Sequence, residues 1–455
     1  MTTKAKKFSL FSDRQFYRSL FALAVPIMFQ NLINSFVNII DTVMIGRLGT
    51  AAIAAVGLGN QVFFLFTMVL FGICSGGSIF TAQYWGKKDI QGIRKNTGLC
   101  LFLNMAIALI FTILVLTVPD RIIGFYSQDL EVIRIGSMYL KTLAPVYVPF
   151  GISFVFIITL RSIERVRLAM VSTLIALSLN MGLNWIFIFG AGPVPAMGVK
   201  GAAIATVIAR IVEMLILVTG SYRRKYQMAG TLREYTGFSL TFVSRFFIIS
   251  GPVIFNELIW ALGITVQNII FARTGTDAIA AFNITNTFSQ LTWVVFIGLG
   301  SGVAVLIGKK IGEGAEDTAR DYAKRIVIFA TILAAVIAAI LYPFSMLLPF
   351  IFNVNLRVME YVSIMFIILC CSYPFRAFNM NLIVGVCRAG GDTIFCVLFE
   401  VFIMWGYSLP LGAMMAFIVH APVWLIYLCL CSEDVFKMIL GLWRLKSGRW
   451  LRTVV

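Results

Sequence analysis

Histidine is almost absent from this sequence, and charged residues are scarce. His420 is the only histidine, and Asp, Glu, Lys and Arg together make up 13% of the 455 residues. The eight cysteines form no CxxC pair, so a zinc site built from cysteine and histidine is not expected. No Walker-type GxxxxGKS motif, nucleotide fingerprint or Ser/His/Asp arrangement is found. An enzyme and a nucleotide-driven pump are therefore disfavoured, and no cofactor is expected.

What the chain has instead is apolar sequence. Hydrophobic residues make up 60% of it, well above the range of soluble proteins. They recur in blocks of about 20 residues, the length of helix that crosses the hydrocarbon layer of a bilayer. A transmembrane β-barrel would show short alternating segments instead. We therefore predict an all-α polytopic membrane protein with twelve transmembrane helices, near residues 19–43, 54–82, 97–118, 139–160, 168–190, 201–220, 246–271, 279–307, 326–349, 361–386, 393–411 and 413–431.

The net charge of +17 is distributed unevenly along the chain. Of the 37 Lys and Arg residues, 28 lie on alternate connections between the predicted helices. This asymmetry follows the positive-inside rule and predicts a multi-pass protein of the plasma (inner) membrane with both termini cytoplasmic. The partner implied by the basic residues is the lipid bilayer, and no nucleic acid is expected.

One segment of the chain occurs twice. Residues 26–94, shifted by 226 positions without a gap, match residues 252–320 with 19 identities in 69 positions. Several identities are prolines and glycines, which apolar composition alone does not produce. Basic connections follow equivalent helices in both halves, so we predict parallel repeats of six helices rather than an inverted pair. Membrane proteins built from two similar halves commonly work at the interface between them, and the repeat therefore indicates a transporter.

The repeat also predicts the limits of the domains. The two halves are separated by a polar and basic linker without low-complexity sequence. We expect a cytoplasmic N-terminal segment (1–18), an N-lobe of six helices (19–220), a cytoplasmic linker (221–245), a C-lobe of six helices (246–431) and a cytoplasmic C-terminal tail (432–455).

Proline and glycine mark special positions inside the predicted helices. Pro26 and Pro252 fall within the first helix of each half, where a proline removes one backbone hydrogen bond and favours a kink. Glycines recur on the following helix of each half, at Gly57, Gly59, Gly72, Gly76 and Gly77 and at Gly298, Gly300 and Gly302. Such small-residue faces let helices approach closely, so we interpret these glycines as packing residues.

Charged side chains within the hydrocarbon are costly, so those that are retained are the first candidates for function. Glu257 lies twelve residues past the basic edge at Arg245, about 18 Å along a helix and near the middle of the bilayer. A carboxyl group there is suited to binding a proton or pairing with a cation. The alternative is a protonated glutamic acid within a helix interface. The full set of candidates is Asp41, Arg210, Glu213, Glu257, Arg376, Glu400 and His420.

Asp41 ends a polar stripe on an otherwise apolar helix. In a bilayer such a stripe faces protein or a wet cavity rather than lipid. Asn180 and Asn184, one turn apart on the fifth helix, form a second polar face that can meet it. The stripe consists of Gln30, Asn31, Asn34, Asn38 and Asp41.

The remaining candidates have other expected partners. Arg210 and Glu213 are close in sequence at a helical spacing, and we expect them to form an internal ion pair. Arg376 is expected either to pair with Glu400 or to face the substrate. His420 is predicted to lie in the last helix, where a structural role is favoured over proton handling.

Several motifs resemble those of the MATE (multidrug and toxic compound extrusion) family, over roughly residues 19–431. Besides Pro26 and Asp41, they are RLGTAAIAA at 47–55, AQYWG at 82–86, NMGLNWIFIFG at 180–190, GVKGAAIAT at 198–206 and RAGGDT at 388–393. The resemblance implies two six-helix lobes in a V-shaped, alternating-access transporter. It also implies export of cationic and amphipathic compounds in exchange for inward Na⁺ or H⁺.

The resemblance extends to individual positions. It assigns Asp41 to an N-lobe cation-coupling site, where Na⁺ is one candidate ion, with Asn180 and Thr206 as polar partners. Glu257 matches an acid of the seventh helix that some members use in the C-lobe. Asn184 stands where some DinF-like relatives carry a second aspartate, which leaves the N-lobe site a single carboxylate.

The tenth helix carries Arg376, Asn379 and Asn381 but no acid, so the polar residues are DinF-like rather than NorM-like. Glu257, Arg376 and Asn379 remain candidates for cation coupling or substrate binding in the C-lobe. The candidates for the substrate cavity are Asn34, Asn38, Gln267 and Asn283.

The sequence therefore predicts a secondary active multidrug antiporter that uses H⁺ or Na⁺, acts on small amphipathic or cationic substrates and is a monomer. The alternative is a flippase or exporter of a lipid-linked or large amphipathic precursor, since fold does not determine substrate. A flippase of polyanionic lipids would need several cations in its cavity, and only Arg210 and Arg376 are available.

Overall fold

All regular secondary structure in the described part of the chain is helical. The computed structural model describes residues 10–343 and 355–455. An isolated bridge joins Ala191 and Val194. Eleven helical segments of this part are long and apolar enough to cross a membrane. Residues 1–9 of the predicted N-terminal segment and 344–349 of the predicted ninth helix lie outside the described residues.

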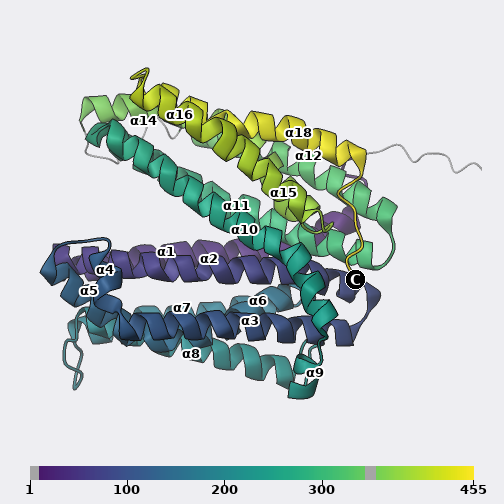
Figure 1. Ribbon diagram of the computed structural model, residues 1–455, viewed down its shortest axis with the longest axis horizontal. Helices are drawn as coiled ribbons and strands as arrows, with labels where there is room; N and C mark the ends of the chain where they lie inside the picture. Colours follow the sequence, from purple (N-terminus) through teal and green to yellow (C-terminus); the bar gives the residue numbers. More distant parts are fainter. Residues whose placement is uncertain (1–9, 344–354) are drawn as a thin grey trace, which may run out of the picture. The chain divides into compact units, whose positions relative to one another are not determined.

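The first six-helix repeat begins with three long helices and is followed by a short helix in the linker (Figure 1). Its fourth span is longer than the predicted 139–160 and begins at Leu130, because α5 continues through a 3₁₀ turn into α6. Glu131 and Arg134 interrupt the apolar sequence near this start, so hydrophobicity alone predicts a later one. The elements are α1 (Arg14–Gly46), α2 (Thr50–Lys87), α3 (Ile90–Thr117), α4 (Pro119–Gly124), α5 (Leu130–Leu143), η1 (Ala144–Val146), α6 (Tyr147–Ser162), α7 (Val166–Phe189), α8 (Val199–Arg223) and α9 (Leu232–Thr236).

The second repeat has the same order of helices. The shift that aligns the two halves of the sequence also carries the starts of α2, α3 and α5 onto those of α11, α12 and α14. The repeat predicted from the sequence is therefore also a repeat of structure. Its described elements are α10 (Leu240–Thr274), α11 (Thr276–Gly312), α12 (Glu316–Leu341), α14 (Leu356–Met380), η3 (Asn381–Cys387), α15 (Thr393–Glu400), η4 (Val401–Ser408), α16 (Leu409–Phe417), α17 (Val423–Cys431) and α18 (Glu433–Ser447).

The last two helices differ from those predicted. The eleventh helix does not end at 411 but continues through Pro410 to Phe417, and the π-helical turn η4 directly precedes this proline. A π turn accommodates the backbone group that proline leaves without a hydrogen-bond partner. The twelfth helix begins at Val423 rather than 413 and continues past 431, because only Ser432 separates α17 from α18. The predicted C-terminal tail (432–455) is therefore helical as far as Ser447.

The chain forms two compact units by its internal contacts. The N-terminal unit contains Phe29–Leu258, and the C-terminal unit contains residues up to Met28 together with Ile259–Val455. The divisions fall inside α1 and α10 rather than in the linker. The first part of α1 therefore belongs with the second repeat, and the first part of α10 belongs with the first repeat. The predicted lobes, 19–220 and 246–431, follow the two repeats of the sequence and remain a prediction.

Glycines of α2 and α11 provide the surfaces on which these helix starts pack. A Cβ on Gly72 would lie 2.8 Å from Cα of Ile254, and one on Gly76 would lie 2.8 Å from Cα of Ser250. In the C-terminal unit the equivalent positions of the repeat meet in the same way, with Met28 against Gly298 and Ala24 against Gly302. The interpretation as packing residues is confirmed for these four glycines and is wrong for Gly57, where a Cβ would meet nothing within 4 Å.

The segment that follows the sixth helix of each repeat packs back onto its own unit. In the N-terminal unit, α9 rests on α3, where Gly98 lies against the backbone of Tyr235 (Figure 1). In the C-terminal unit, the buried Trp450 lies against Gly390, and the Arg452 amide donates to the Gly390 carbonyl at 2.9 Å. Both segments are therefore ordered parts of the fold.

Candidate functional site

Asp41 lies in a group of polar side chains drawn from three helices of the N-terminal unit. Asn184 donates from Nδ2 to Asp41 Oδ1 at 2.7 Å. In the amide orientation that satisfies both neighbours, Asn180 donates to Asp41 Oδ2 and accepts from the Thr206 amide, each at 3.3 Å. α1, α7 and α8 thus bring together the four residues expected at the N-lobe site.

One oxygen of this group lacks a donor. Asn184 Oδ1 is buried and has no hydrogen-bond partner in the described part of the chain. An unpaired buried acceptor is costly, and either a hydrogen-bond donor or a cation relieves the cost. A protonated Asp41 carboxyl or a Na⁺ ion at oxygen ligands would each fit the donor set.

Arg210 and Glu213 form the ion pair that their spacing predicts, with Nη1 and Oε2 2.7 Å apart. The pair lies at one end of a series of side-chain hydrogen bonds. Thr173 donates to Glu213 Oε1 at 2.8 Å, and Gln30 donates to Thr173 at 2.6 Å. Arg161 in turn donates to Gln30. Thr173 and Arg161 were not among the predicted residues, because their side chains lie on neighbouring helices and follow no common spacing.

Arg376 and Asn379 in the C-terminal unit both contact Asp434 of α18. Arg376 Nε lies 3.0 Å from Asp434 Oδ2. Asn379 Nδ2 donates to the Asp434 carbonyl at 2.8 Å and to its Oδ1 at 3.3 Å. The expected pairing of Arg376 with Glu400 is wrong, because the partner of Glu400 is Lys437 at 3.0 Å.

The acids and the lysine of α18 were missed because their segment was assigned to the tail. A signal was present in the sequence, since Glu433 and Lys437 have the spacing of a helical ion pair. Apolar residues at Phe436, Ile439 and Leu440 also continue the periodicity of a helix beyond 431.

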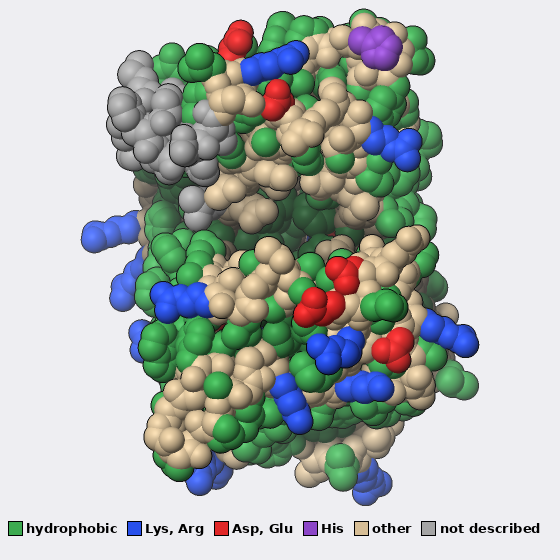
Figure 2. Space-filling model, turned by 90° about the vertical axis from the view of Figure 1, so that its left-hand side faces the viewer, with side chains coloured by type: hydrophobic (Ala, Val, Ile, Leu, Met, Phe, Trp, Pro, Cys, Tyr) green, Lys and Arg blue, Asp and Glu red, His purple; other side chains and the backbone are tan. Residues whose placement is uncertain are grey.

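The other candidates are dispersed. Glu257 is buried in α10 and is grouped with the N-terminal unit, whereas Arg376 and Asn379 are in the C-terminal unit. His420, the purple group in Figure 2, is exposed and lies in the turn between α16 and α17, so the prediction of a helical histidine is wrong. Of the proposed cavity residues, Asn34 and Gln267 are partly buried. Asn38 and Asn283 are exposed.

Gln267 has a further meaning in the repeat. It stands at the position of α10 that is equivalent to Asp41 in α1 when the two halves are aligned. The two repeats therefore place a carboxyl in one unit and a neutral amide in the other at the same level of their first helices. Among the described residues of the C-terminal unit, the polar group around Asp41 has no counterpart at this position.

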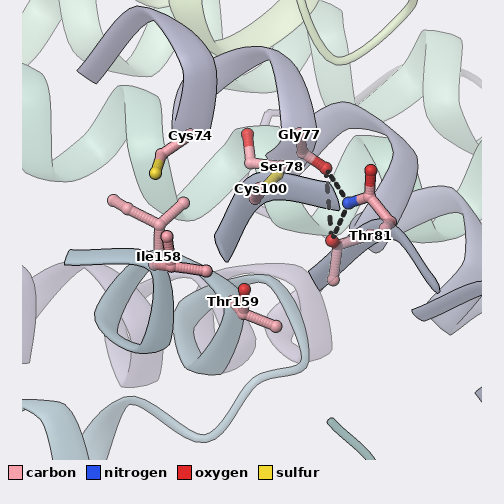
Figure 3. Close-up of a pocket in the computed structure, with 9 residues that line it drawn as sticks. Cys74, Gly77, Ser78, Thr81, Cys100, Ile158 and Thr159 are labelled. Carbon is pink, nitrogen blue, oxygen red and sulfur yellow. Dashed lines mark hydrogen bonds between the residues drawn. The ribbon is translucent and has the colours of Figure 1, made fainter. Parts of the chain in front are cut away.

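A small pocket in the N-terminal unit lies apart from these residues (Figure 3). Asn96 crosses from α3 to α2, where its Nδ2 donates at 2.8 Å to the Gly77 carbonyl and to Thr81 Oγ1. The residues lining the pocket include no acid and no base other than two cysteine thiols, Cys74 and Cys100. Its contacts tie two helices together. Within 10–343 and 355–455, no three His, Cys, Asp or Glu side chains are placed to hold a metal ion.

Comparisons with known proteins agree on one family. The sequence model of the MatE family matches residues 26–186 and 252–424. A probable multidrug resistance protein NorM of Thermotoga maritima is 24% identical over 440 residues, which cover 96% of this chain and 94% of that protein. The uncharacterized transporter YisQ of Bacillus subtilis is 22% identical over 446 residues, covering 97% of this chain and 96% of its own.

A solved structure has the same fold. The Vibrio cholerae MATE transporter VcmN in its bent form superimposes with a TM-score of 0.85, at 17% sequence identity, over 95% of this chain and 97% of that one. At this identity the likeness concerns the fold alone.

Proposed function

The chain belongs to the MatE family of membrane transporters, and we propose that it is a secondary active antiporter that exports cationic and amphipathic compounds in exchange for inward H⁺ or Na⁺. The family is not enzymatic. The name of the Thermotoga maritima relative, which records multidrug resistance, supports this class of substrate. On its polar residues the chain is nearer to the DinF-like than to the NorM-like members.

Asp41 is proposed as the coupling carboxylate, and one observation carries this assignment. Asn184 donates from Nδ2 to the Asp41 carboxylate, while its own Oδ1 is buried and has no partner among the described residues. A proton on Asp41 converts an acceptor into a donor, and a Na⁺ ion adds a positive charge that both oxygens can approach. Either ion stabilises the group, so ion binding changes the contacts that α1 makes with α7.

The remaining assignments are part of the same proposal. The distribution of Lys and Arg supports a plasma-membrane protein with cytoplasmic termini. Glu257, Arg376 and Asn379 are proposed to act in the C-lobe, and Asn34, Asn38, Gln267 and Asn283 to line the route of the substrate. The protein is proposed to act as a monomer, with alternating access of the substrate site to the two sides of the membrane.

The test is ethidium efflux from cells that express this chain, with Na⁺ and pH gradients imposed separately. We expect efflux driven by one gradient, with loss in Asp41→Asn and unchanged efflux in Asp120→Asn, which alters an exposed aspartate of α4. Asn184→Leu should weaken the response to the ion gradient while leaving membrane insertion unchanged.

Two results would count against the proposal. Efflux that is equally strong in Asp41→Asn would remove Asp41 from the coupling site. Absence of gradient-driven efflux, with the protein folded and in the membrane, would favour the flippase alternative and make lipid translocation the next assay. The contacts weigh against polyanionic lipids, because the side chains of Arg210 and Arg376 are each paired with a carboxylate.

A further inference from the structure

Five charged side chains form a cluster in the C-terminal unit, where α14, the α15–η4 helix and α18 meet. Lys437 donates to Glu400 at 3.0 Å and to Glu433 at 3.3 Å. Arg376 pairs with Asp434 one turn before Lys437. The side chains of Lys437 and Glu400 are 7% and 6% exposed, so the cluster is built into a helix interface rather than onto the surface.

The first repeat contains a smaller set of charges at the corresponding place. When the start of α8 is aligned with that of α17, Arg210 corresponds to Asp434 and Glu213 to Lys437. The order of the charges is reversed between the repeats. In the first repeat the two side chains form one neutral pair.

The second repeat adds charges that the first lacks. When the start of α7 is aligned with that of α15, Glu400 takes the position of Thr173. Glu433 corresponds to Ala209 in the alignment of α8 with α17. With Arg376 included, the cluster has three carboxylates and two cations, and it bears one uncompensated negative charge when every group is ionised.

A buried set of charges is most stable when it is electrically neutral, because the protein interior screens charge poorly. We propose that this cluster binds one proton, shared among Glu400, Glu433 and Asp434, and so forms a proton-binding site distinct from the ion site proposed at Asp41. Its binding of a proton does not depend on the proposed function, whereas a part in coupling export to a gradient rests on it.

Two buried oxygens in the cluster lack a hydrogen-bond donor, which supports the binding of a proton there. Glu433 Oε2 and Asn379 Oδ1 are buried and accept no hydrogen bond of good geometry among the described residues. Ser408 lies near the Glu433 carboxylate, but its hydroxyl donates to the Leu430 carbonyl at 3.2 Å. Asn379 is 4% exposed, and its own Nδ2 is bonded to Asp434, so the amide lies within the cluster. An additional proton turns a carboxylate oxygen of the cluster into a donor, which is what such acceptors lack.

The groups that face Arg376 from neighbouring helices do not supply the missing positive charge. Ser289 of α11 and Cys431 of α17 bond to its guanidinium at 3.1 and 3.4 Å. The phenols of Tyr373 on α14 and Tyr427 on α17 also lie near it. Hydroxyl, thiol and phenol groups are neutral or negative, so each leaves the net charge of the cluster unchanged or lowers it.

The remaining neighbours of α18 add no free cation either. Tyr407 of η4 bonds to Ser432 at 3.1 Å. The next cation along α18, Arg444, lies two turns further on and is held by Asp392. No described group of His, Cys, Asp and Glu is placed to hold a metal ion, which favours a proton as the ligand.

The test counts the protons that the purified full-length protein takes up in nanodiscs when the pH is lowered from alkaline to neutral values. Infrared difference spectra recorded in the same step report protonated carboxyl groups directly. All variants carry Asp41→Asn, so that the N-terminal site does not contribute. Glu316→Gln, which alters an exposed glutamate at the start of α12, is the matched control.

The expected counts follow from the charges of the cluster. Glu433→Gln should lose one proton and the carboxyl band, because it leaves two carboxylates against two cations. Lys437→Met should gain one proton, and Lys437→Met with Glu400→Gln should return to the parent count. Equal counts in Glu433→Gln and its parent would overturn the proposal, as would a count in Lys437→Met that does not rise. Absence of gradient-driven ethidium efflux by the chain that retains Asp41, together with the expected proton counts, would affect the proposed function alone.

Discussion

Alanine at two equivalent glycines is expected to change the stability of the protein to unequal extents. Gly76 and Gly302 occupy the same position in the two repeats, and each faces the start of the first helix of the other repeat. A Cβ on Gly76 would lie 2.8 Å from Cα of Ser250, whereas one on Gly302 would lie 3.3 Å from the nearest atoms of Ala24. Carbon atoms in contact sit about 3.5–4.0 Å apart, so α10 must move by roughly 1 Å and α1 by a few tenths.

The magnitude follows from these distances. Overpacking of this kind costs about 1–3 kcal/mol. Replacement of a helical glycine by alanine contributes about 0.5–1 kcal/mol of stability at both sites. Gly76→Ala should therefore be less stable than Gly302→Ala by about 2 kcal/mol, roughly a thirtyfold difference in the ratio of folded to unfolded protein.

The assay is denaturant unfolding of the two purified variants in the same detergent. Ser250→Gly in the Gly76→Ala background should recover part of the loss, because it removes the Cβ and Oγ of the facing residue. The double variant thereby separates the contact from an effect of alanine on α2 itself. Equal stability of the two alanine variants would refute close packing as the reason for these glycines.

Three further predictions concern regions outside the proposed sites. Asp392→Asn should lower the free energy of unfolding by about 3–5 kcal/mol, because Arg444, which contacts both oxygens of Asp392 at 2.7 and 2.9 Å, loses its counter-charge. Denaturant unfolding of the purified protein measures this, and unchanged stability would show the pair to be dispensable. Trp450→Ala should cost about 3–5 kcal/mol by leaving a cavity over the loop at Gly390, with greater cleavage near 388–392 by protease as the second readout. Hydrogen bonds from the Thr231 backbone and then from Arg94 lower the pKa of Glu234, so the contribution of this carboxylate to the docking of α9 is present above the ordinary pKa of glutamate and is lost as the pH falls through the lowered pKa. Proteolysis of the linker should rise on this acidification, and the rise should be absent in Glu234→Gln.

Much of the fold follows from the sequence because the repeat records it twice. Matches at glycine and proline align the halves from the amino acids alone, and the helix starts at Thr50 and Thr276 keep the same alignment. The helices that were misjudged are those whose sequence departs from plain hydrophobicity. Pro410 favoured a helix end near 411, but the helix continues because the π turn η4 accommodates the proline. The charges of α18 favoured a tail outside the membrane-spanning helices.

The candidate sites were predictable to different degrees. Asp41, Asn180 and Asn184 lie on regular helical spacings, so the faces they share could be derived from periodicity. The choice of partner for Arg376 could not, because it depends on which helices are neighbours. Asp434 is distant from Arg376 along the chain, and only the packing of α18 against α14 brings the two side chains together.

The exchanged starts of α1 and α10 have a consequence for how the protein is made. A chain that has been synthesised only as far as α8 lacks residues 240–258, which cover the glycine face of α2. The beginning of α1 likewise lacks its packing partners α11 and α12, which are synthesised only after the whole first repeat and the linker. Neither repeat is complete as an independent folding product, so maturation of both is tied to the moment when the second repeat inserts. Cutting the chain in the linker yields two fragments that need each other, which distinguishes this duplication from a pair of autonomous domains joined in tandem.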